Sequence, residues 1–128
     1  HLGGGSLPVG SARRLVGDRA LVGASVHSLE EAVRAEEEGA DYLVLGTIFE
    51  TRSHPGVKPA GTTLIARVVA AVRVPVIAIG GIDPRNVGAV MEAGAAGAAV
   101  ITAIQSAEDV EGATRALLSA MGSHAGNR

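Results

Sequence analysis

Two consecutive glycines follow a strand-like apolar run and stand just before a helix-start pattern. The stretch VPVIAIGGIDPRN, residues 74–86, contains Gly80 and Gly81, then Asp83 as a candidate N-cap and Pro84 as a candidate first helical residue. Backbone N–H groups without side chains around them can approach an anion closely, and a helix N-terminus favours negative charge. The pattern is consistent with phosphate binding. Paired glycines also relieve crowding between a strand and its neighbours, so this stretch alone leaves both interpretations open.

A hydroxyl group strengthens the phosphate interpretation. The next apolar run, residues 95–104, contains Thr102, whose side chain could donate a hydrogen bond to the same anion. Loops that follow the last two strands of a (β/α)₈ barrel commonly form a phosphate site. Taken together, the glycine pair and Thr102 favour phosphate binding over a purely structural role.

Three titratable residues are candidates for proton transfer. His54 lies in a loop rich in Gly and Pro, and an unperturbed histidine has a pKa of about 6.5, which suits acid–base chemistry near neutral pH. Simple solvent exposure is the alternative for His54. His27 directly precedes a helix cap and could instead have a structural hydrogen-bonding role. Glu50 is either an acid–base group or a carboxylate that stabilises its loop, and the sequence favours neither.

The elements that must position these residues alternate along the chain. Apolar runs predict strands in residues 19–25, 41–49, 74–81 and 95–104, and helical patterns fall in residues 28–38, 61–72, 83–94 and 106–121. This alternation is typical of βα units around a parallel sheet, and strands without polar alternation are expected to be covered on both faces. The candidate residues then meet at the carboxyl edge of the sheet. His1 and Leu2 could be the end of one further strand.

One helix is predicted from its two ends. Ser28 followed by Glu31 forms a capping box, and Gly39 supplies the C-terminal stop. The acidic run of residues 36–38 inside this helix is predicted to be a solvated face, because successive helical residues point about 100° apart and cannot converge on a metal ion.

Composition excludes several classes of protein. The chain has 128 residues, 47% of them hydrophobic, a formal charge of −2 and no cysteine. With two aromatic residues and no Lys/Arg run, it lacks the features of a nucleic-acid-binding protein. No apolar stretch approaches the roughly 20 residues that span a bilayer, and the first residues do not resemble a signal peptide. We therefore expect a cytoplasmic protein with a small-molecule partner, and a flexible tail at residues 122–128.

Several segments in unbroken order resemble the second half of the thiamine phosphate synthase/TenI family. They are HLGGGSLPVGSARRLVG, GASVHSLEEAVRAEEEGADYLVLGTIFET, HPGVKPAGTTL, VPVIAIGGI and GAAGAAVITAIQSAEDVEGA. The family fold is α/β, a (β/α)₈ TIM barrel. The resemblance implies that residues 1–121 form the C-terminal half of such a barrel, from the end of strand 4 to helix 8. Full-length members of the family are often oligomeric, so the resemblance also implies a homo-oligomer.

The resemblance implies a site that binds thiazole phosphate. It assigns the phosphate to Gly81, Ile101 and Thr102, next to Gly80 from the glycine pair. Further ligand contacts around the barrel mouth are implied for Ser25, Thr47, Thr51, Ser53 and Gly61. One branch of the family, the synthases, joins hydroxymethylpyrimidine diphosphate to thiazole phosphate with Mg²⁺. The TenI-like branch isomerises a thiazole phosphate carboxylate by proton transfer.

Two departures from the synthase pattern favour the tautomerase branch. Gly4, Gly5 and Ser6 stand where a synthase has a carboxylate for Mg²⁺, and His54 stands where it has a diphosphate-binding lysine. The main expectation is therefore a thiazole tautomerase without a metal or other cofactor, with His54, Glu50 or His27 as proton carrier. Thr47 stands where a characterised type of tautomerase has its acid–base histidine. Two alternatives follow, a Mg²⁺-dependent synthase and a non-catalytic ligand-binding or regulatory protein.

Overall fold

The protein is described by a computed structural model, which covers residues 1–52 and 55–125, with side chains through residue 122. Four strands form one parallel sheet in the order β1 (Gly23–Val26), β2 (Tyr42–Leu45), β3 (Val76–Ile79) and β4 (Gly97–Ala99). Leu2 forms a single parallel bridge with Ala24 at the free side of β1, as expected for the end of a further strand. The predicted α/β class with a parallel sheet is confirmed.

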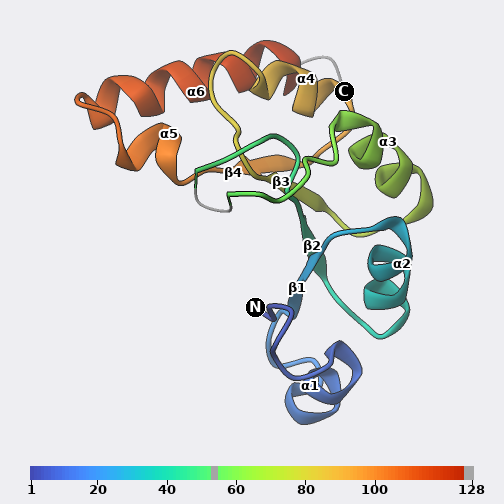
Figure 1. The fold of residues 1–128 in the computed structure, drawn as a ribbon. Coiled ribbons are helices and arrows are strands. Elements are labelled where there is room, and N and C mark those ends of the chain that lie inside the picture. Colours follow the sequence, from blue (N-terminus) through green and yellow to red (C-terminus); the bar gives the residue numbers. More distant parts are fainter. Residues whose placement is uncertain (53–54, 126–128) are drawn as a thin grey trace.

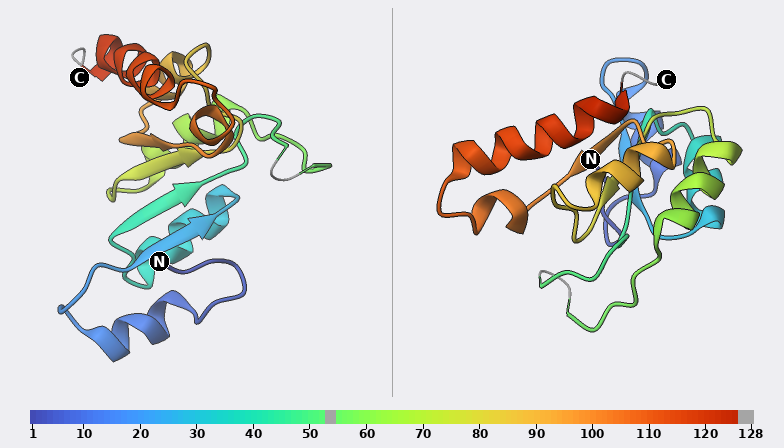
Figure 2. Two further views of the ribbon diagram at one scale, coloured as in Figure 1. Left: turned by 90° about the vertical axis from the view of Figure 1, so that its left-hand side faces the viewer. Right: turned by 90° about the horizontal axis from the view of Figure 1, so that it is seen from above.

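Helices lie before β1, between consecutive strands and after β4, and they follow one side of the sheet. They are α1 (Val9–Val16), α2 (Leu29–Glu37), α3 (Thr62–Ala71), α4 (Val87–Glu92), α5 (Thr102–Gln105) and α6 (Val110–Ala125). Helix α2 packs against α3, and α4 packs against α6. Figures 1 and 2 show this arrangement, with α1 beneath the β1 end of the sheet and α6 over the β4 end.

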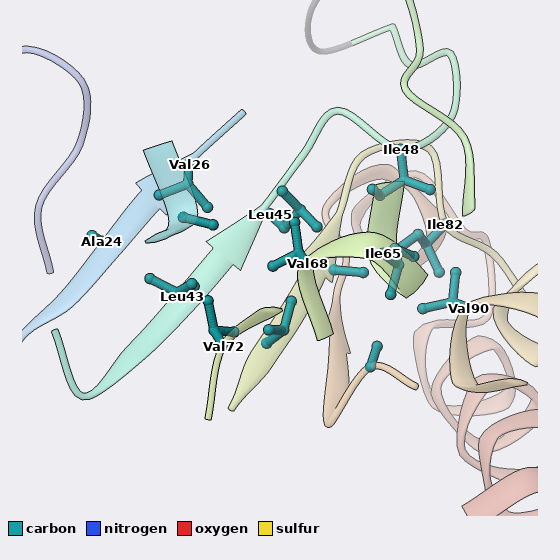
Figure 3. Packing of buried hydrophobic residues seen from close by; sticks show 14 of the residues in the cluster. Ala24, Val26, Leu43, Leu45, Ile48, Ile65, Val68, Val72, Ile82 and Val90 are labelled. Atoms are coloured by element: carbon teal, nitrogen blue, oxygen red, sulfur yellow. The ribbon is translucent and has the colours of Figure 1, made fainter. Parts of the chain in front are cut away.

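The hydrophobic core lies between the sheet and these helices. In β2, Leu43 and Leu45 are fully buried and belong to the same core cluster as Ile65 and Val68 of α3 (Figure 3). Val76 and Ala78 of β3 continue the same buried row. Because side chains alternate across a strand, this face contains every second residue of the apolar runs.

The opposite face of the sheet is less covered than predicted. Ser25, Tyr42, Val44, Ile77 and Ile79 all lie on it and are only partly buried. The apolar runs predicted strands covered on both faces, and in this structure only the helix side is closed. Within the described residues, two edges of the sheet also lack a complete neighbouring strand. Strand β4 pairs only with β3. Strand β1 pairs with β2 on one side and has only the Leu2 bridge on the other.

Helix boundaries differ from the predictions where local signals were weak. Helix α1 was not predicted, although Pro8 and Gly17 flank it. Helix α4 begins at Val87 because residues 83–86 form a turn, so the predicted helix start at Asp83 is wrong.

Two other predicted elements also change. The strand predicted to reach residue 104 ends at Ala99, and helix α5 occupies residues 102–105 in its place. The helix predicted for residues 106–121 is α6, which begins only at Val110. Helix α6 continues to Ala125, past the predicted start of the tail at residue 122, and residues 126–128 lie outside the described residues.

The acidic helix is capped as predicted, but its carboxylates are not all solvated. Ser28 Oγ accepts a hydrogen bond from Glu31 N at 3.1 Å, which confirms the cap of α2. Glu36 accepts hydrogen bonds from the backbone N–H groups of Arg73 and Val74, and Glu38 accepts one from Gly10 N at 3.2 Å. These two side chains therefore tie the C-terminal end of α2 to the first turn of α1 and to the loop before β3.

No helix in the described part of the chain is both long and apolar enough to cross a bilayer.

Candidate functional site

A cavity of about 250 Å³ opens at the carboxyl edge of the sheet. Each of the four strands contributes to its wall, because the carboxyl ends of parallel strands meet at one edge. Eight of the predicted site residues line it, and they come from all four strand ends: Ser25 in β1 and His27 after it, Thr47 and Thr51 after β2, Gly80 and Gly81 after β3, and Ile101 and Thr102 after β4. The sequence prediction that residues distant in the chain meet here is consistent with this placement.

The glycine pair is required by a close approach of the chain itself. Gly80 and Gly81 have φ angles of 109° and 63°, a region that side-chain-bearing residues rarely adopt. A Cβ on Gly80 would lie 2.6 Å from Thr47 Cγ2, and one on Gly81 would overlap Phe49 and the backbone of Glu50. The crowding explanation of the two glycines therefore applies, with the loop after β2 as the crowding segment. Both glycines also line the cavity.

The carbonyl groups of both glycines are bound by the protein. Gly80 O accepts a hydrogen bond from Phe49 N at 3.0 Å, and Gly81 O accepts one from Asn86 Nδ2 at 2.9 Å. These bonds fix the peptide planes at the cavity wall. The part of the phosphate prediction that relied on a helix directly after the glycines is weakened, because α4 starts only at Val87 and has six residues.

Thr102 and Gly81 stand between the main cavity and a second, more open hollow of about 300 Å³. Ile101 lies beside Thr102, lines the main cavity and is 48% exposed. The second hollow adds charged groups of both signs, Glu50, Arg52 and Asp83. A ligand bound at Gly81 and Thr102 would therefore lie at a junction between an apolar cavity and a charged rim.

Asp83 is ionised at this rim. Its partial burial raises the pKa, but hydrogen bonds from the side chain and backbone N–H of Arg85, helped by the charge of Arg85, outweigh burial and leave the pKa below its usual value. The same pairing raises the pKa of the Arg85 guanidinium. Because its charge is already compensated by Arg85, Asp83 is a poor candidate for proton transfer at neutral pH.

His27 lies at the cavity rim, but its contacts are those of a helix cap. The His27 backbone N donates to Glu31 Oε2 at 2.8 Å, and the ring Nδ1 is 3.6 Å from the same oxygen. The imidazole is 60% exposed and also lines the cavity. This geometry favours the structural, hydrogen-bonding role for His27. The ring nevertheless remains part of the cavity wall.

The remaining predicted residues fall into two groups. Glu50 lines the open hollows rather than the main cavity, and Gly61 caps α3 with its N–H bonded to Ile48 O at 2.9 Å. As far as the described residues define the main cavity, neither belongs to its lining. Ser53 and His54 lie outside the described residues, so their predicted roles stay predictions.

The sequence reasoning missed the apolar part of the wall. Val44 and Ile79 from the strands, and Val57 and Val100 from the loops, line the cavity beside the polar residues. Strand alternation could have identified Val44 and Ile79, because each lies on the same face as the strand residue Ser25. Apolar walls of this kind suit an aromatic ring rather than a fully hydrated ligand.

The described residues do not fit the Mg²⁺ site that a synthase resemblance implies. In residues 1–52 and 55–125, no three His, Cys, Asp or Glu side chains come together in a group that could hold a metal ion. The turn at Gly4, Gly5 and Ser6 offers no carboxylate. Mg²⁺ prefers carboxylate oxygens, so this part of the chain supplies no first ligand for it.

Comparison with known proteins is consistent with this architecture. A family model described as thiamine monophosphate synthase matches residues 1–104. The thiamine-phosphate synthase of Chlorobium luteolum is 48% identical over 122 residues, which cover 94% of this chain and 58% of that protein. That of Methanoculleus marisnigri is 48% identical over 118 residues, covering 91% of this chain and 56% of that protein.

Solved structures also share this fold. A thiamine phosphate pyrophosphorylase from Pyrococcus furiosus superposes with a TM-score of 0.86 at 39% identity, covering 96% of this chain and 58% of that one. A 3-hexulose-6-phosphate synthase, at a TM-score of 0.73 and 22% identity, shares the fold alone. The chain spans less than two thirds of the length of these relatives.

Proposed function

Because the chain belongs to the thiamine monophosphate synthase family, we propose that it is part of an enzyme that joins hydroxymethylpyrimidine diphosphate to thiazole phosphate. The observation that carries the proposal is the 48% identity to thiamine-phosphate synthases, together with a cavity whose wall contains Ser25, Thr51, Gly81 and Thr102. These comparisons favour the synthase alternative over the tautomerase that the two sequence departures favoured.

In this proposal the cavity holds thiazole phosphate by its two ends. The phosphate lies at Gly81, Ile101 and Thr102, where backbone N–H groups and one hydroxyl can donate to its oxygens. The ring lies against Val44 and Ile79, which exclude water from it. Fixing one reactant in this way lowers the entropic cost of bringing it to the second reactant. No part of this scheme is assigned to a metal, because the described residues do not fit one.

The chain is further proposed to supply the C-terminal half of a barrel. A compact 12.8 kDa protein has a surface of about 6,300 Å². This chain exposes 7528 Å², which is about 1,200 Å² more. The uncovered face with Val44, Ile77 and Ile79 and the free edges of β1 and β4 account for such an excess. We expect the chain alone to self-associate, and a stable, well-folded monomer in size-exclusion chromatography would contradict this expectation.

The function is tested by combining binding with turnover. Isothermal titration of the chain with thiazole phosphate should show binding, and Thr102→Val should weaken it about 5- to 10-fold through the lost charge-assisted hydrogen bond. A hydroxyl on the helix α3 surface, removed in Thr63→Val, is the matched control and should leave affinity unchanged. Equal affinity of Thr102→Val and wild type would refute the phosphate site.

Turnover separates the alternatives. With both substrates and Mg²⁺, the protein should release diphosphate and form thiamine phosphate, measured by chromatography. Conversion of a thiazole phosphate carboxylate to its aromatic tautomer, without thiamine phosphate formation, would replace the proposal with the tautomerase. Binding with neither reaction would support the ligand-binding alternative.

A further inference from the structure

A hydrogen-bonded row of three side chains leads into the cavity on the open face of the sheet. His1 Nδ1 is 3.2 Å from the Tyr42 hydroxyl, and His1 Nε2 is 2.8 Å from Ser25 Oγ. The two rings are also stacked, with centroids 5.7 Å apart and planes at 27°. Ser25 lines the cavity, whereas His1 and Tyr42 do not belong to its wall as the described residues define it. The histidine therefore connects a residue behind the wall to one in it.

The backbone holds this row in place. Leu2 forms two hydrogen bonds to β1, from its N–H to Gly23 O at 2.8 Å and from Ser25 N to its carbonyl at 2.9 Å, so His1 enters beside Gly23. Gly23 is in turn the register partner of Tyr42. His1, Gly23 and Tyr42 thus stand at one level across three neighbouring chain segments.

Gly23 is the gap that lets the two outer side chains meet. A Cβ at this position would overlap the Tyr42 ring, which lies across the bare Cα. The absence of a side chain in the middle of the row therefore brings the Tyr42 hydroxyl within reach of the imidazole. The sequence does not predict the proximity of His1 and Tyr42, because it depends on pairing between distant segments.

We propose that His1, held by Tyr42, is a positioning residue that makes the Ser25 hydroxyl a hydrogen-bond donor to the ligand. A phenol hydroxyl is a good donor, so Tyr42 donates to His1 Nδ1 and the imidazole proton lies on Nε2. Nε2–H then donates to Ser25 Oγ, and the only proton left on Ser25 points to a further acceptor. The cavity is the space that Ser25 faces.

The position of Ser25 restricts the ligand. Ser25 belongs to β1 and Gly81 follows β3, two strand spacings away, which is about 10 Å across the sheet. A ligand that reaches both has an anionic group at one end and an acceptor, such as a ring nitrogen or a second oxyanion, at the other. This inference rests on the proposed function for the identity of the ligand, but the state of His1 does not depend on it.

The first test needs no ligand. The ¹⁵N shifts of the His1 imidazole, measured by NMR above pH 7.5 in the full chain, should report one fixed tautomer with the proton on Nε2. Tyr42→Phe keeps the ring over Gly23 and removes only the hydroxyl, so it should release the imidazole into a mixture of tautomers. A histidine that already exchanges in the wild type, or one that Tyr42→Phe does not change, would overturn the proposal.

The second test measures coupling. With thiazole phosphate as the probe, Ser25→Ala and Tyr42→Phe should each weaken binding by about 3- to 10-fold. The double variant should bind no more weakly than Ser25→Ala, because Tyr42 acts through Ser25. Effects that multiply in the double variant would contradict a positioning role. Urea unfolding of each variant checks that the fold is intact.

The two proposals fail differently. Absence of thiazole phosphate binding by the wild type, together with a fixed His1 tautomer that Tyr42→Phe releases, would overturn the proposed ligand and support the positioning of Ser25. Thiazole phosphate binding that is independent of Tyr42 would support the ligand and overturn the positioning role.

Discussion

The two edges of the sheet hold the backbone of their connecting loops with different groups. At the amino edge, charged side chains bind loop backbone: Asp41 accepts from Val22 N at 2.7 Å, and Arg13 Nε donates to Gly39 O at 3.1 Å. At the carboxyl edge, uncharged groups bind the glycine carbonyls: the Phe49 backbone N–H donates to Gly80 O, and the Asn86 side-chain amide donates to Gly81 O. Gly80 and Gly81 allow the loop after β2 to approach this edge directly, because they have no side chains that would separate the two segments. Among the described residues, no side chain occupies the cavity beside them. The amino edge is thus held by charged side chains, whereas the carboxyl edge carries the cavity in which the proposed ligand would bind.

The two faces of the sheet also differ, because the helix side is buried and the opposite face is only partly covered. Substitutions of buried and half-buried strand residues test this difference. Leu45→Ala should lower the free energy of unfolding by about 3–5 kcal/mol, because Leu45 is fully buried against α3 and a cavity would remain. Urea denaturation measures this change. It is the largest effect we expect from a single substitution in the sheet.

Two substitutions of the same kind, one on each face, compare the faces directly. Val26→Ala on the helix side and Val44→Ala on the open side remove the same atoms from adjacent strands. The first should cost about 2 kcal/mol and the second about 1 kcal/mol or less. Equal losses would mean that the open face is covered in solution and that the division between the faces is wrong.

Gly81 at the carboxyl edge should tolerate a side chain less well than Gly17 at the amino edge. Gly81→Ala should destabilise the protein by about 2–4 kcal/mol, from the cost of the left-handed backbone and from overlap with Phe49 and Glu50. Gly17→Ala is the control, since Gly17 has a similar φ of 57° but nothing within 4 Å of an added Cβ. It should lose only the backbone part, about 1–2 kcal/mol.

Both variants are measured by urea unfolding, followed by titration of the folded fraction with thiazole phosphate. A Gly81→Ala protein as stable as Gly17→Ala would show that the loop after β2 moves away easily. The close approach would then not explain why both residues at this strand end are glycines.

The central architecture was predictable because it depends on local patterns. The apolar runs located all four strands, and Ser28 with Glu31 and Gly39 located α2 almost to the residue. Less was predictable where a short apolar run fits either element. Residues 100–104 continue the apolar run of β4, yet Thr102 begins α5. Helix α1 was missed because, unlike α2, it has no side-chain N-cap: Pro8 stands at that position.

The site was predictable as a place but not as a set of contacts. Gly81 and Thr102 could be placed together because parallel strands end at one edge. Crowding was one of two explanations left open for the two glycines, but the crowding segment could not be identified, because Thr47 and Phe49 lie more than 30 residues away in the chain. The pairing of His1 with Ser25 depends in the same way on the Leu2 bridge to β1.

The smallest expected effect tests the charged amino edge through its pH dependence. Hydrogen bonds from Val22 N–H and then from the Arg13 side chain lower the pKa of Asp41, against a smaller opposing effect of burial. A carboxyl group whose pKa is lower in the folded state stabilises the protein above its unfolded pKa of about 3.9, and this stabilisation is lost as the pH falls through the folded value. Unfolding free energy should therefore decline below about pH 4.

Asp41→Asn isolates that contribution, because Asp83 has a lowered pKa too and acts in the same pH range in both proteins. Urea midpoints at pH 7 and pH 3 should differ less in Asp41→Asn than in wild type, and Asp18→Asn, at an exposed position, should retain the wild-type difference. If Asp41→Asn kept the full pH dependence, the hydrogen bonds to Val22 and Arg13 would hold the amino edge no more firmly than solvent does. The contrast between the two edges would then not depend on these hydrogen bonds.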